Sequence, residues 1–312
     1  MTDNCDLPNM LFAPPGEYIK DHSLIFEGGR WHFFSISGQT GRCWLDKGSE
    51  ESISHSSSPD LVNWVMHGHP VKASGKDGYN DEHMAVAPHV VKANDGLFYM
   101  AYSGWRHPNK RPNFNYEGHL ESIYMAVSND LFNWNIPEHI EPCGITVTKG
   151  EPIKGRDPHL FFDAKDERWL LYYTRQTDNA PFSVGVAQSR DLNTWENMGD
   201  AIVIQSGDYI FNPCESPFVL KHPLSGKYIL LLNWDYSISE DPLRFDSLTP
   251  LPFKAGIVKN EYTWEGVGAG FAREVISHNG QNYFSGVLGP DGYFKLGFTP
   301  FRWTDEFLEL EI

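Results

Sequence analysis

The heptapeptide Ser58–Trp64 (SPDLVNW) returns as Ser128–Trp134 (SNDLFNW) and once more as Ser189–Trp195 (SRDLNTW). All three copies share the pattern Ser-x-Asp-Leu-x-x-Trp, and they lie about 60 to 70 residues apart along the chain. Repetition at a long interval is typical of a fold built from similar units. Because Ser and Asp favour turns, we interpret each copy as a structural turn rather than as part of a catalytic site.

A second pattern recurs with the first and predicts one β-hairpin in each unit. It consists of a short apolar run, a polar turn and an aromatic strand, as in HSLIF-EGGR-WHFFSIS at residues 22–37. Turn residues between two strand-like runs are the usual signal of a hairpin. The pattern occurs five times, at residues 22–37, 87–103, 158–174, 216–234 and 272–287.

Five hairpins in 312 residues give units of about 60 residues, a size that fits a four-stranded propeller blade with long loops. The sequence therefore predicts an all-β fold, a single five-bladed β-propeller over residues 1–312. We expect the Ser-x-Asp-Leu-x-x-Trp turns at the outer strands of blades one to three. A β-sandwich, the rival all-β fold, does not explain a long repeat with one hairpin per unit. The expected blades cover residues 15–65, 84–135, 155–196, 213–250 and 262–304.

The composition agrees with an all-β fold and excludes several classes of protein. The chain contains 10 Trp, 14 Tyr and 20 Phe, which favour strands, and 28 Gly and 21 Pro, which favour turns. Its 41 acidic and 25 basic residues give a net charge of −16, which argues against nucleic acid or an anionic membrane as a partner. Without a signal-peptide pattern or a long apolar segment, we expect a cytoplasmic protein; a secreted protein that has lost its leader is the alternative.

Acidic residues recur near the expected starts of three blades. Asp21 precedes the first hairpin, Asp157 the third and Glu215 the fourth, and we expect them to occupy equivalent positions. Because the innermost strands of a propeller line its central channel, equivalent positions converge at one end of the axis. Two carboxylates across a glycosidic bond are the apparatus of glycoside cleavage, and a third can raise the pKa of the proton donor. The three acids therefore predict a catalytic site for sugars.

The residues around these acids suit a carbohydrate, because aromatic faces stack on sugar rings while polar groups bind hydroxyls. Most of the aromatic side chains are interpreted as blade core. The candidate substrate-binding residues are His22, His83, Trp105, Arg106, Arg156, Trp234, Asp235 and Arg273.

Three of the expected blades resemble those of the five-bladed propeller glycoside hydrolases, families 43 and 32 and their relatives. In GRDPHLFFDAKDERWLLYYT, residues 155–174, the Arg-Asp-Pro triplet is similar to the Arg-Asp-Pro motif of family 32. In VAPHVV, residues 86–91, Val86 stands where family 43 has the Trp of a Trp-Ala-Pro motif. In CESP, residues 214–217, the Glu-x-Pro pattern resembles the general-acid motif of both families. The resemblance covers roughly residues 15–300.

This resemblance implies a glycoside hydrolase with a role for each acid. Asp21 would be the general base, as in family 43, or the nucleophile, as in family 32. Asp157 would orient the site and tune the acid, Glu215 would be the general acid, and Arg156 would bind substrate. Asp21 departs from the usual pattern, because His22 follows it where the families have the proline of an Asp-Pro motif.

Metal ligands are not indicated by the sequence. The 13 histidines show no pair with the spacing of zinc ligands. Residues 266–275 (GVGAGFAREV) also lack the histidine that many members of family 43 place at the axis beside a metal. We therefore expect neither a metal nor a cofactor.

The favoured hypothesis is a glycoside hydrolase that cleaves a small oligosaccharide, a furanoside such as a fructoside or an arabinoside. One alternative is a propeller glycoside phosphorylase that uses Arg106, Arg156 and Arg273 as a phosphate pocket. Another is a propeller that binds carbohydrate without chemistry, which the altered surroundings of Asp21 would suit. The inserts that would shape the pocket carry no further motif, and they lie at residues 38–55, 66–83, 104–121 and 200–212.

Overall fold

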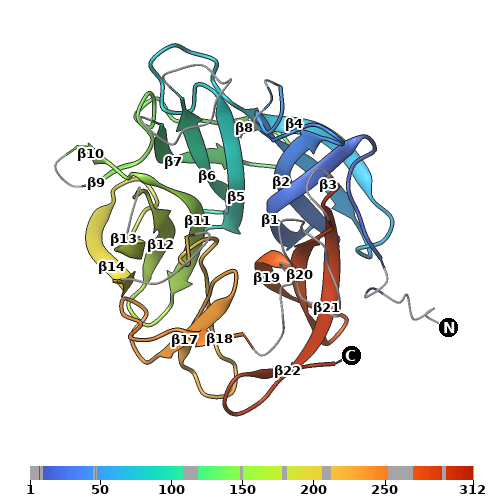
Figure 1. Cartoon of the computed structure of the whole chain (residues 1–312), viewed down its shortest axis with the longest axis vertical. Helices are drawn as coiled ribbons and strands as arrows, with labels where there is room; N and C mark the ends of the chain where they lie inside the picture. Colours follow the sequence, from blue (N-terminus) through green and yellow to red (C-terminus); the bar gives the residue numbers. More distant parts are fainter. Residues whose placement is uncertain are drawn as a thin grey trace.

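Five antiparallel sheets of four strands each surround a central axis in the computed structural model (Figure 1). The prediction of an all-β, five-bladed propeller is confirmed. The structure describes residues 7, 10–44, 46, 48–107, 119–147, 150–177, 181–205, 212–251, 270–289 and 293–311, so the expected start of blade five at residue 262 lies outside them. Within these ranges, no helix has the length and apolar character needed to cross a membrane.

In every blade the order of strands in the sheet follows the chain, and the first strand lies nearest the axis (Figure 1). Blade one contains β1 (Glu17–Glu27), β2 (Arg30–Gln39), β3 (Ser52–Ser58) and β4 (Val65–Lys72). Blade two contains β5 (Met84–Lys92), β6 (Phe98–Arg106), β7 (Leu120–Ser128) and β8 (Trp134–Asn135). Blade three contains β11 (Gly155–Asp163), β12 (Arg168–Arg175), β13 (Phe182–Ser189) and β14 (Glu196–Ile204).

Two further blades and a small ribbon complete the chain. Blade four contains β15 (Phe218–Lys221), β16 (Tyr228–Leu231), β17 (Asp235–Ser239) and β18 (Thr249–Pro250). Blade five contains β19 (Phe271–His278), β20 (Gln281–Leu288), β21 (Lys295–Trp303) and β22 (Leu308–Leu310). Between blades two and three, β9 (Thr146–Val147) pairs with β10 (Glu151–Pro152).

The repeated heptapeptides connect the third strand to the fourth in blades one to three, where the sequence places them. In the second copy, Asp130 Oδ1 accepts hydrogen bonds from the backbone N–H groups of Phe132 and Asn133, both at 2.8 Å. The Trp134 indole N–H donates to the Leu131 carbonyl at 3.0 Å, while the Leu131 side chain is buried. These contacts satisfy the turn's own backbone, so the motif has a structural role.

Two expected inserts contain outer strands that the sequence analysis missed. The range 66–83 holds most of β4, and the range 200–212 holds the end of β14. The β4 sequence, VMHGHPVK, is mostly exposed and shows no regular alternation of apolar and polar residues. An edge strand of this kind pairs through its backbone, so its side chains give no pattern that predicts it.

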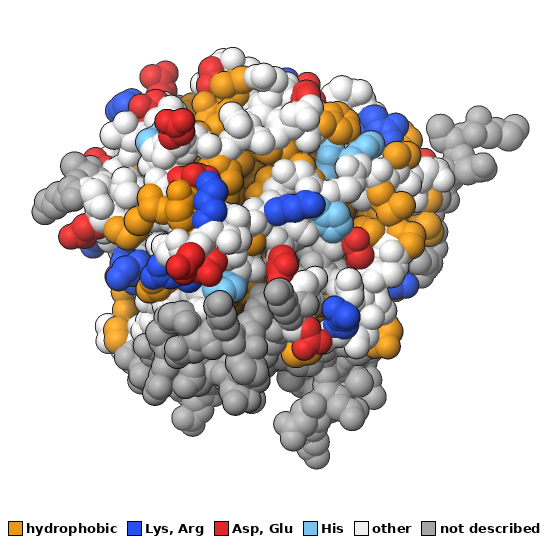
Figure 2. Space-filling view, turned by 90° about the horizontal axis from the view of Figure 1, so that it is seen from above, with side chains coloured by type: hydrophobic (Ala, Val, Ile, Leu, Met, Phe, Trp, Pro, Cys, Tyr) orange, Lys and Arg blue, Asp and Glu red, His pale blue; other side chains and the backbone are white. Residues whose placement is uncertain are grey.

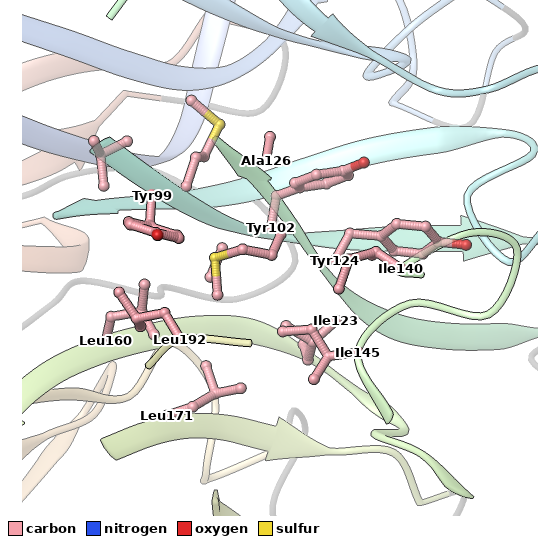
Figure 3. Close-up of a cluster of buried hydrophobic side chains, with 14 of the residues drawn as sticks. Tyr99, Tyr102, Ile123, Tyr124, Ala126, Ile140, Ile145, Leu160, Leu171 and Leu192 are labelled. Atoms are coloured by element: carbon pink, nitrogen blue, oxygen red, sulfur yellow. The ribbon is translucent and has the colours of Figure 1, made fainter. Parts of the chain in front are cut away.

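Apolar side chains fill the space between neighbouring blades. One cluster joins blades two and three, where Tyr99 of β6 lies on the side of Leu160 and Leu171 of blade three (Figure 3). Aromatic residues dominate these contacts because each buries a large apolar area. The packing of blade against blade fixes the inner strands relative to one another, which the site requires.

The N-terminal segment closes the ring of blades. Phe12 forms an antiparallel bridge with Leu296 of β21, with backbone hydrogen bonds of 3.0 and 2.7 Å in the two directions. Farther along, the Ile19 N–H donates to the Phe294 carbonyl at 3.1 Å. These bonds tie blade five to blade one, and β1 lies beside β19 (Figure 1).

Charged side chains of both signs are interspersed on the side of the ring that Figure 2 shows, with hydrophobic side chains between them. Several of the exposed charges form ion pairs, such as Lys76 with Glu141 at 3.0 Å. On this face the negative net charge is therefore not gathered into one acidic field.

Candidate active site

The inner strands share an irregularity at the point where they approach the axis. In four blades the pairing of the first strand with the second skips two residues, which is a β-bulge. Bulges re-aim side chains and occur often beside active sites. The skipped pairs are Lys20-Asp21, Ala87-Pro88, Asp157-Pro158 and Ala272-Arg273.

The three acids occupy neighbouring positions of this irregularity rather than equivalent ones. Asp157 adopts a left-handed backbone conformation, with φ of 54°, and so does Ser216 in blade four, with φ of 52°. Glu215 therefore stands one position earlier than Asp157, while Asp21 stands one position later, where blades two to four have proline. The expectation that the three acids occupy equivalent positions is therefore wrong by one residue for Glu215 and by one residue for Asp21. The side chains nevertheless converge, as their contacts show.

Side chains from all five blades line a narrow channel on the axis. Its volume is about 30 Å³, which is room for water but not for a sugar ring. The three acids keep part of their surface exposed. The charged and polar residues of its lining are Asp21, His22, His89, Asp157, His159, Ser216, Arg273 and Glu274.

Asp21 lies at the wall of this channel and is hydrogen-bonded across the ring to blade four. The Ser216 hydroxyl donates to Asp21 Oδ1 at 2.8 Å. Burial raises the pKa of Asp21, and the nearby Glu215 carboxylate raises it further, whereas Ser216 and Lys20 oppose the shift. Two strands that are far apart in sequence thus place one carboxylate under the influence of the next.

Asp157 is the most firmly held of the three acids. Its Oδ2 accepts hydrogen bonds from the Thr174 hydroxyl at 3.1 Å and from the Ser216 N–H at 3.2 Å. Its own N–H donates to the Ser103 hydroxyl at 2.9 Å. Burial raises the pKa of Asp157 well above its usual value, and Asp21 adds to the shift more strongly than Glu215 does. Close carboxylates resist ionising together, so protons are shared within this group.

Arg156 joins Glu215 to a further acid that the sequence analysis missed. Its guanidinium pairs with Glu215 through Nη2, with Glu121 Oε2 at 3.3 Å and with Asp157 Oδ2 at 3.5 Å. Glu121 lies in β7, the third strand of blade two, and its side chain is fully buried, whereas the Glu215 side chain is 26% exposed. Glu121 is therefore a fixed partner of Arg156, and Glu215 is the one that solvent or substrate can reach.

His119 completes the surroundings of Glu121. Its Nε2 lies 3.1 Å from Glu121 Oε1. Burial alone would raise the pKa of Glu121, but Arg156 and His119 outweigh it and hold the pKa below its usual value. In the sequence LESIYMAVS, a single Glu in an apolar strand was the only sign of this residue.

An aromatic wall continues from His119 along the pocket. The Trp105 ring lies 5.7 Å from that of His119 and 6.3 Å from that of Trp44, and both tryptophans pack against Val86 and Ala87 at the inner end of blade two. Lys20 lies over the Trp44 ring at 4.9 Å. Trp105 also pairs with Glu121 across β6 and β7, and its role in binding stays a prediction.

Three neutral histidines and a glutamic acid line the channel one position beyond the bulge. Burial lowers the pKa of His22 to about 3 and that of His159 to about 4, and it also lowers the pKa of His89. Burial raises the pKa of Glu274 to about 8. These four side chains therefore give the channel polar but largely uncharged groups at neutral pH. In the described residues, no group of three or more His, Cys, Asp or Glu is arranged to hold a metal ion.

The other predicted binding residues lie beside the wall or outside the lining of the channel. The His83 N–H donates to the Trp105 carbonyl at 3.0 Å, and Arg106 Nη1 donates to the Gly78 carbonyl at 2.6 Å, so both belong to the wall. Trp234 and Asp235 form the turn into β17, where the Leu251 N–H donates to the Trp234 carbonyl at 2.9 Å. Neither of these two residues lines the channel.

Arg273 lines the channel, and its guanidinium donates hydrogen bonds to backbone carbonyl groups. Its Nη1 donates to the carbonyls of Leu232 at 3.2 Å and Asn233 at 2.8 Å. The side chain is 3% exposed, and burial lowers its pKa to about 9. Arg273 thus ties blade five to the turn of blade four.

The five-bladed propeller brings two aspartates, a glutamate and an arginine together at one end of its axis. This arrangement has the features of the propeller glycoside hydrolases. The chain belongs to glycoside hydrolase family 32, because the model of the glycosyl hydrolases family 32 N-terminal domain matches residues 12–234, more than two thirds of its length. No curated protein matches the chain.

Solved structures of families 32 and 43 share the fold. A family 32 β-fructofuranosidase of Bombyx mori superposes with a TM-score of 0.67 at 17% identity, covering 96% of this chain and 64% of that one. A β-xylosidase/α-arabinofuranosidase from a compost metagenome gives 0.63 at 15% identity, with 95% and 94% covered. An α-L-arabinofuranosidase of Clostridium thermocellum gives 0.59 at 16% identity, with 93% and 92% covered. The chain thus spans less than two thirds of the silkworm enzyme and most of the family 43 enzymes.

Proposed function

We propose that this glycoside hydrolase cleaves small furanosides, and fructosides in particular, with Asp21, Asp157 and Glu215 at its catalytic centre. The observation that carries the proposal is the convergence of these acids from blades one, three and four. They are linked through Ser216 and Arg156, Glu215 raises the pKa of Asp21, and both Asp21 and Glu215 raise the pKa of Asp157. These acids lie up to 194 residues apart in sequence, and bringing them together raises the pKa values of Asp21 and Asp157. Groups of acids with raised pKa values are typical of functional sites.

The exposure of each carboxylate supports a distinct role. The Glu215 side chain is 26% exposed, more than that of Asp157, and is suited to meet the oxygen of a leaving group as general acid. Asp157, which is 12% exposed and held by three hydrogen bonds, is suited to fix sugar hydroxyls and to tune its neighbours. Asp21 would then act on the anomeric carbon, either as the nucleophile or as the base that activates water.

Arg156 is suited to exchange partners when a substrate binds. It carries one positive charge beside three carboxylates, and only Glu121 among them is fully buried. A sugar hydroxyl could take the place of Glu215 at Nη2 while Glu121 keeps the guanidinium in position. Glu215 would then be free to turn toward the glycosidic oxygen.

The comparisons support a furanoside as the substrate. The matching family is 32, and the silkworm relative, a β-fructofuranosidase, has also been solved with sucrose bound. The Clostridium thermocellum relative, an arabinofuranosidase, extends the choice to a second furanoside. The wall formed by Trp44 and Trp105 offers apolar faces against which a small sugar can stack.

Phosphorolysis, the alternative reaction, receives little support from the arginines that it needs. Arg156 is surrounded by Glu121, Asp157 and Glu215, so a phosphate dianion would meet more negative than positive charge. Arg106 and Arg273 are bonded to backbone carbonyls. Water is therefore the acceptor that these surroundings favour.

A turnover screen with wild type and Glu215→Gln tests the proposal. The panel contains sucrose, inulin and levan oligosaccharides, arabino- and xylo-oligosaccharides and aryl furanosides, each with and without phosphate. We expect sugar release from a fructoside without phosphate, and a loss of about 10²–10⁴ in kcat in the variant, as for the removal of a general acid. Aryl furanosides with good leaving groups should lose much less.

Glu240→Gln is the matched control, because the Glu240 side chain is 80% exposed and lies in the β17–β18 region of blade four. It should keep the wild-type rate. Equal rates for wild type and Glu215→Gln on sucrose would exclude Glu215 as the acid. Sugar binding by folded wild type without turnover of any compound would favour a binding propeller instead.

A further inference from the structure

Ser216 makes two different hydrogen bonds to two different catalytic acids. Its hydroxyl donates to Asp21 Oδ1 at 2.8 Å, and its backbone N–H donates to Asp157 Oδ2 at 3.2 Å. It follows Glu215 directly in the chain, so one short segment contacts all three acids of the site. Ser216 is partly exposed and lines the channel beside Asp21.

The backbone at this position does not explain the choice of serine. Ser216 has φ of 52°, and the matching residues of blades two and five are Ala87 with φ of 50° and Ala272 with φ of 48°. Alanine therefore adopts this conformation twice in the same fold. The hydroxyl of Ser216 is not needed for the bulge, and it donates a hydrogen bond to Asp21.

We propose that Ser216 is a positioning residue that holds the Asp21 carboxylate in its working orientation and in its ionised form. This inference rests on the proposed function of Asp21. A hydroxyl that donates to a carboxylate stabilises the charged form, and a charge-assisted hydrogen bond is about twice as strong as a neutral one. It also selects one orientation of the carboxylate, which leaves Oδ2 for the substrate.

The other groups around Asp21 make this contribution necessary. Burial raises the pKa of Asp21, and so does Glu215 from the segment before β15. Asp157 of β11 is a further acid beside Asp21, and the Asp21 charge raises the pKa of Asp157. Glu274 of β19 adds a mainly neutral carboxyl group to the channel. The opposing groups are Ser216, the backbone N–H of Asp21, and Lys20, whose ammonium is paired with Glu50 at 2.8 Å. Arg273 also lines the channel.

The sign of the effect follows from the role of Asp21. A nucleophile or base works only when it is ionised, so its pKa sets the acidic limb of the pH profile of kcat/KM. Loss of the Ser216 hydroxyl removes a contact that lowers this pKa. The acidic limb should therefore move to higher pH.

Ser216→Ala is the direct test, because it removes the bond to Asp21 and keeps the N–H bond to Asp157. We expect the acidic limb of kcat/KM to move up by about one pH unit, with the greatest loss of activity below the limb. Ser285→Ala is the control. It deletes a fully buried hydroxyl whose partner is His22 Nε2, at 2.9 Å, and should leave the limb in place.

A measurement that does not depend on turnover separates this inference from the proposed function. Carbon-13 NMR of labelled aspartate, assigned with Asp21→Asn, gives the carboxyl pKa of Asp21 in wild type and variant. A rise of about one pH unit in Ser216→Ala supports the role of Ser216 even if no glycoside is cleaved. An unchanged Asp21 pKa overturns it, whatever the turnover screen shows.

Ser216→Gly provides a second variant that also lacks the hydroxyl. Glycine accepts a positive φ without strain, so the fold is kept if the alanine variant is unstable. Both variants should show the same displacement of the Asp21 pKa. A rise in one and not in the other would assign the effect to the backbone and contradict the proposal.

Discussion

At the scale of single residues, the site is an excess of negative charge held by a few fixed partners. Arg156 is shared by Glu121, Asp157 and Glu215, and Asp21 stands just beyond them. Removing one partner of a buried pair costs more than the pair contributes, because the other charge stays buried. The residues that hold the acids should therefore affect both stability and activity.

Replacing Glu121 with Gln should lower the free energy of unfolding at pH 7 by about 3 kcal/mol, the lower end for a broken buried pair, since Arg156 keeps two other acids. Burial opposes ionisation of Glu121, but Arg156 and His119 hold its pKa below the usual value. The stability gained this way is present above the unfolded pKa and is lost as pH falls through the folded pKa. Urea unfolding at pH 7 and in acid should therefore show a smaller cost in acid.

The control for this variant is Glu309→Gln, which removes an exposed pair with Arg302. It should leave the free energy of unfolding close to the wild-type value, because exposed ion pairs contribute little. An equal cost of Glu121→Gln at both pH values would show that its ionisation does not stabilise the fold.

Glu274 should make the wild-type protein less stable as the pH rises. Burial raises the pKa of Glu274 from 4.5 to about 8, so its stabilising protonated form is fully present below pH 4.5 and is lost as the pH rises through about 8. Glu274→Gln cannot ionise, and its amide oxygen can still accept from the Leu24 N–H, a bond of 2.8 Å in the wild type. Denaturant unfolding at pH 5 and pH 9 should show a smaller decline for the variant. Parallel declines would mean that Glu274 is not the group that titrates.

At the scale of elements, the sequence predicts what local chemistry determines. The five inner hairpins combine aromatic strands with polar turns, so their pattern is visible without the fold. The outer strand β4 pairs through its backbone at an exposed edge, and its side chains show no alternation. The bulges that offset Asp21 from Asp157 depend on pairing with the next strand, which a sequence pattern does not express.

The candidate site also contains residues that the sequence predicts and residues that it does not. Asp157 and Glu215 were identified from short motifs next to proline, and Arg156 from its place in one of them. Glu121 was missed because its partner is 35 residues away, and only the contact of β7 with β11 brings the two together. Trp234 and Asp235 end a strand in the sequence prediction, but neither residue lines the channel.

The repeated turn should contribute measurably to stability. Asp130→Ala removes the acceptor of the Phe132 and Asn133 N–H groups and should lower the free energy of unfolding by about 1 kcal/mol, as loss of a helix cap does. Asp130→Asn keeps an acceptor oxygen and should lose less. Urea unfolding distinguishes the two, and an alanine variant as stable as wild type would remove the structural role from the motif.

At the scale of the whole molecule, the site depends on a closed ring. The proposed catalytic acids come from blades one, three and four, so their spacing is set by the packing of every blade between them. The bridge between Phe12 and Leu296 joins the first blade to the last. The Phe12 ring also stacks on Trp64 at 4.8 Å and meets Phe33 edge-on at 5.9 Å.

Phe12→Ala should weaken this closure. We expect a loss of about 2 kcal/mol in the free energy of unfolding, less than for a fully buried phenylalanine because Phe12 is only partly buried. Thermal unfolding measures the change, and Phe12→Leu, which keeps an apolar side chain, should recover much of it. Wild-type stability in the alanine variant would show that the ring closes without this contact.

The central claim is that Asp21, offset by one residue from its counterpart in blade three, takes part in breaking a glycosidic bond. Sucrose hydrolysis by wild type and Asp21→Asn at saturating substrate tests it most directly, with circular dichroism to confirm that both proteins are folded. We expect the wild type to release fructose and the variant to be slower by about 10³ or more. A folded Asp21→Asn variant that hydrolyses sucrose at the wild-type rate would contradict it.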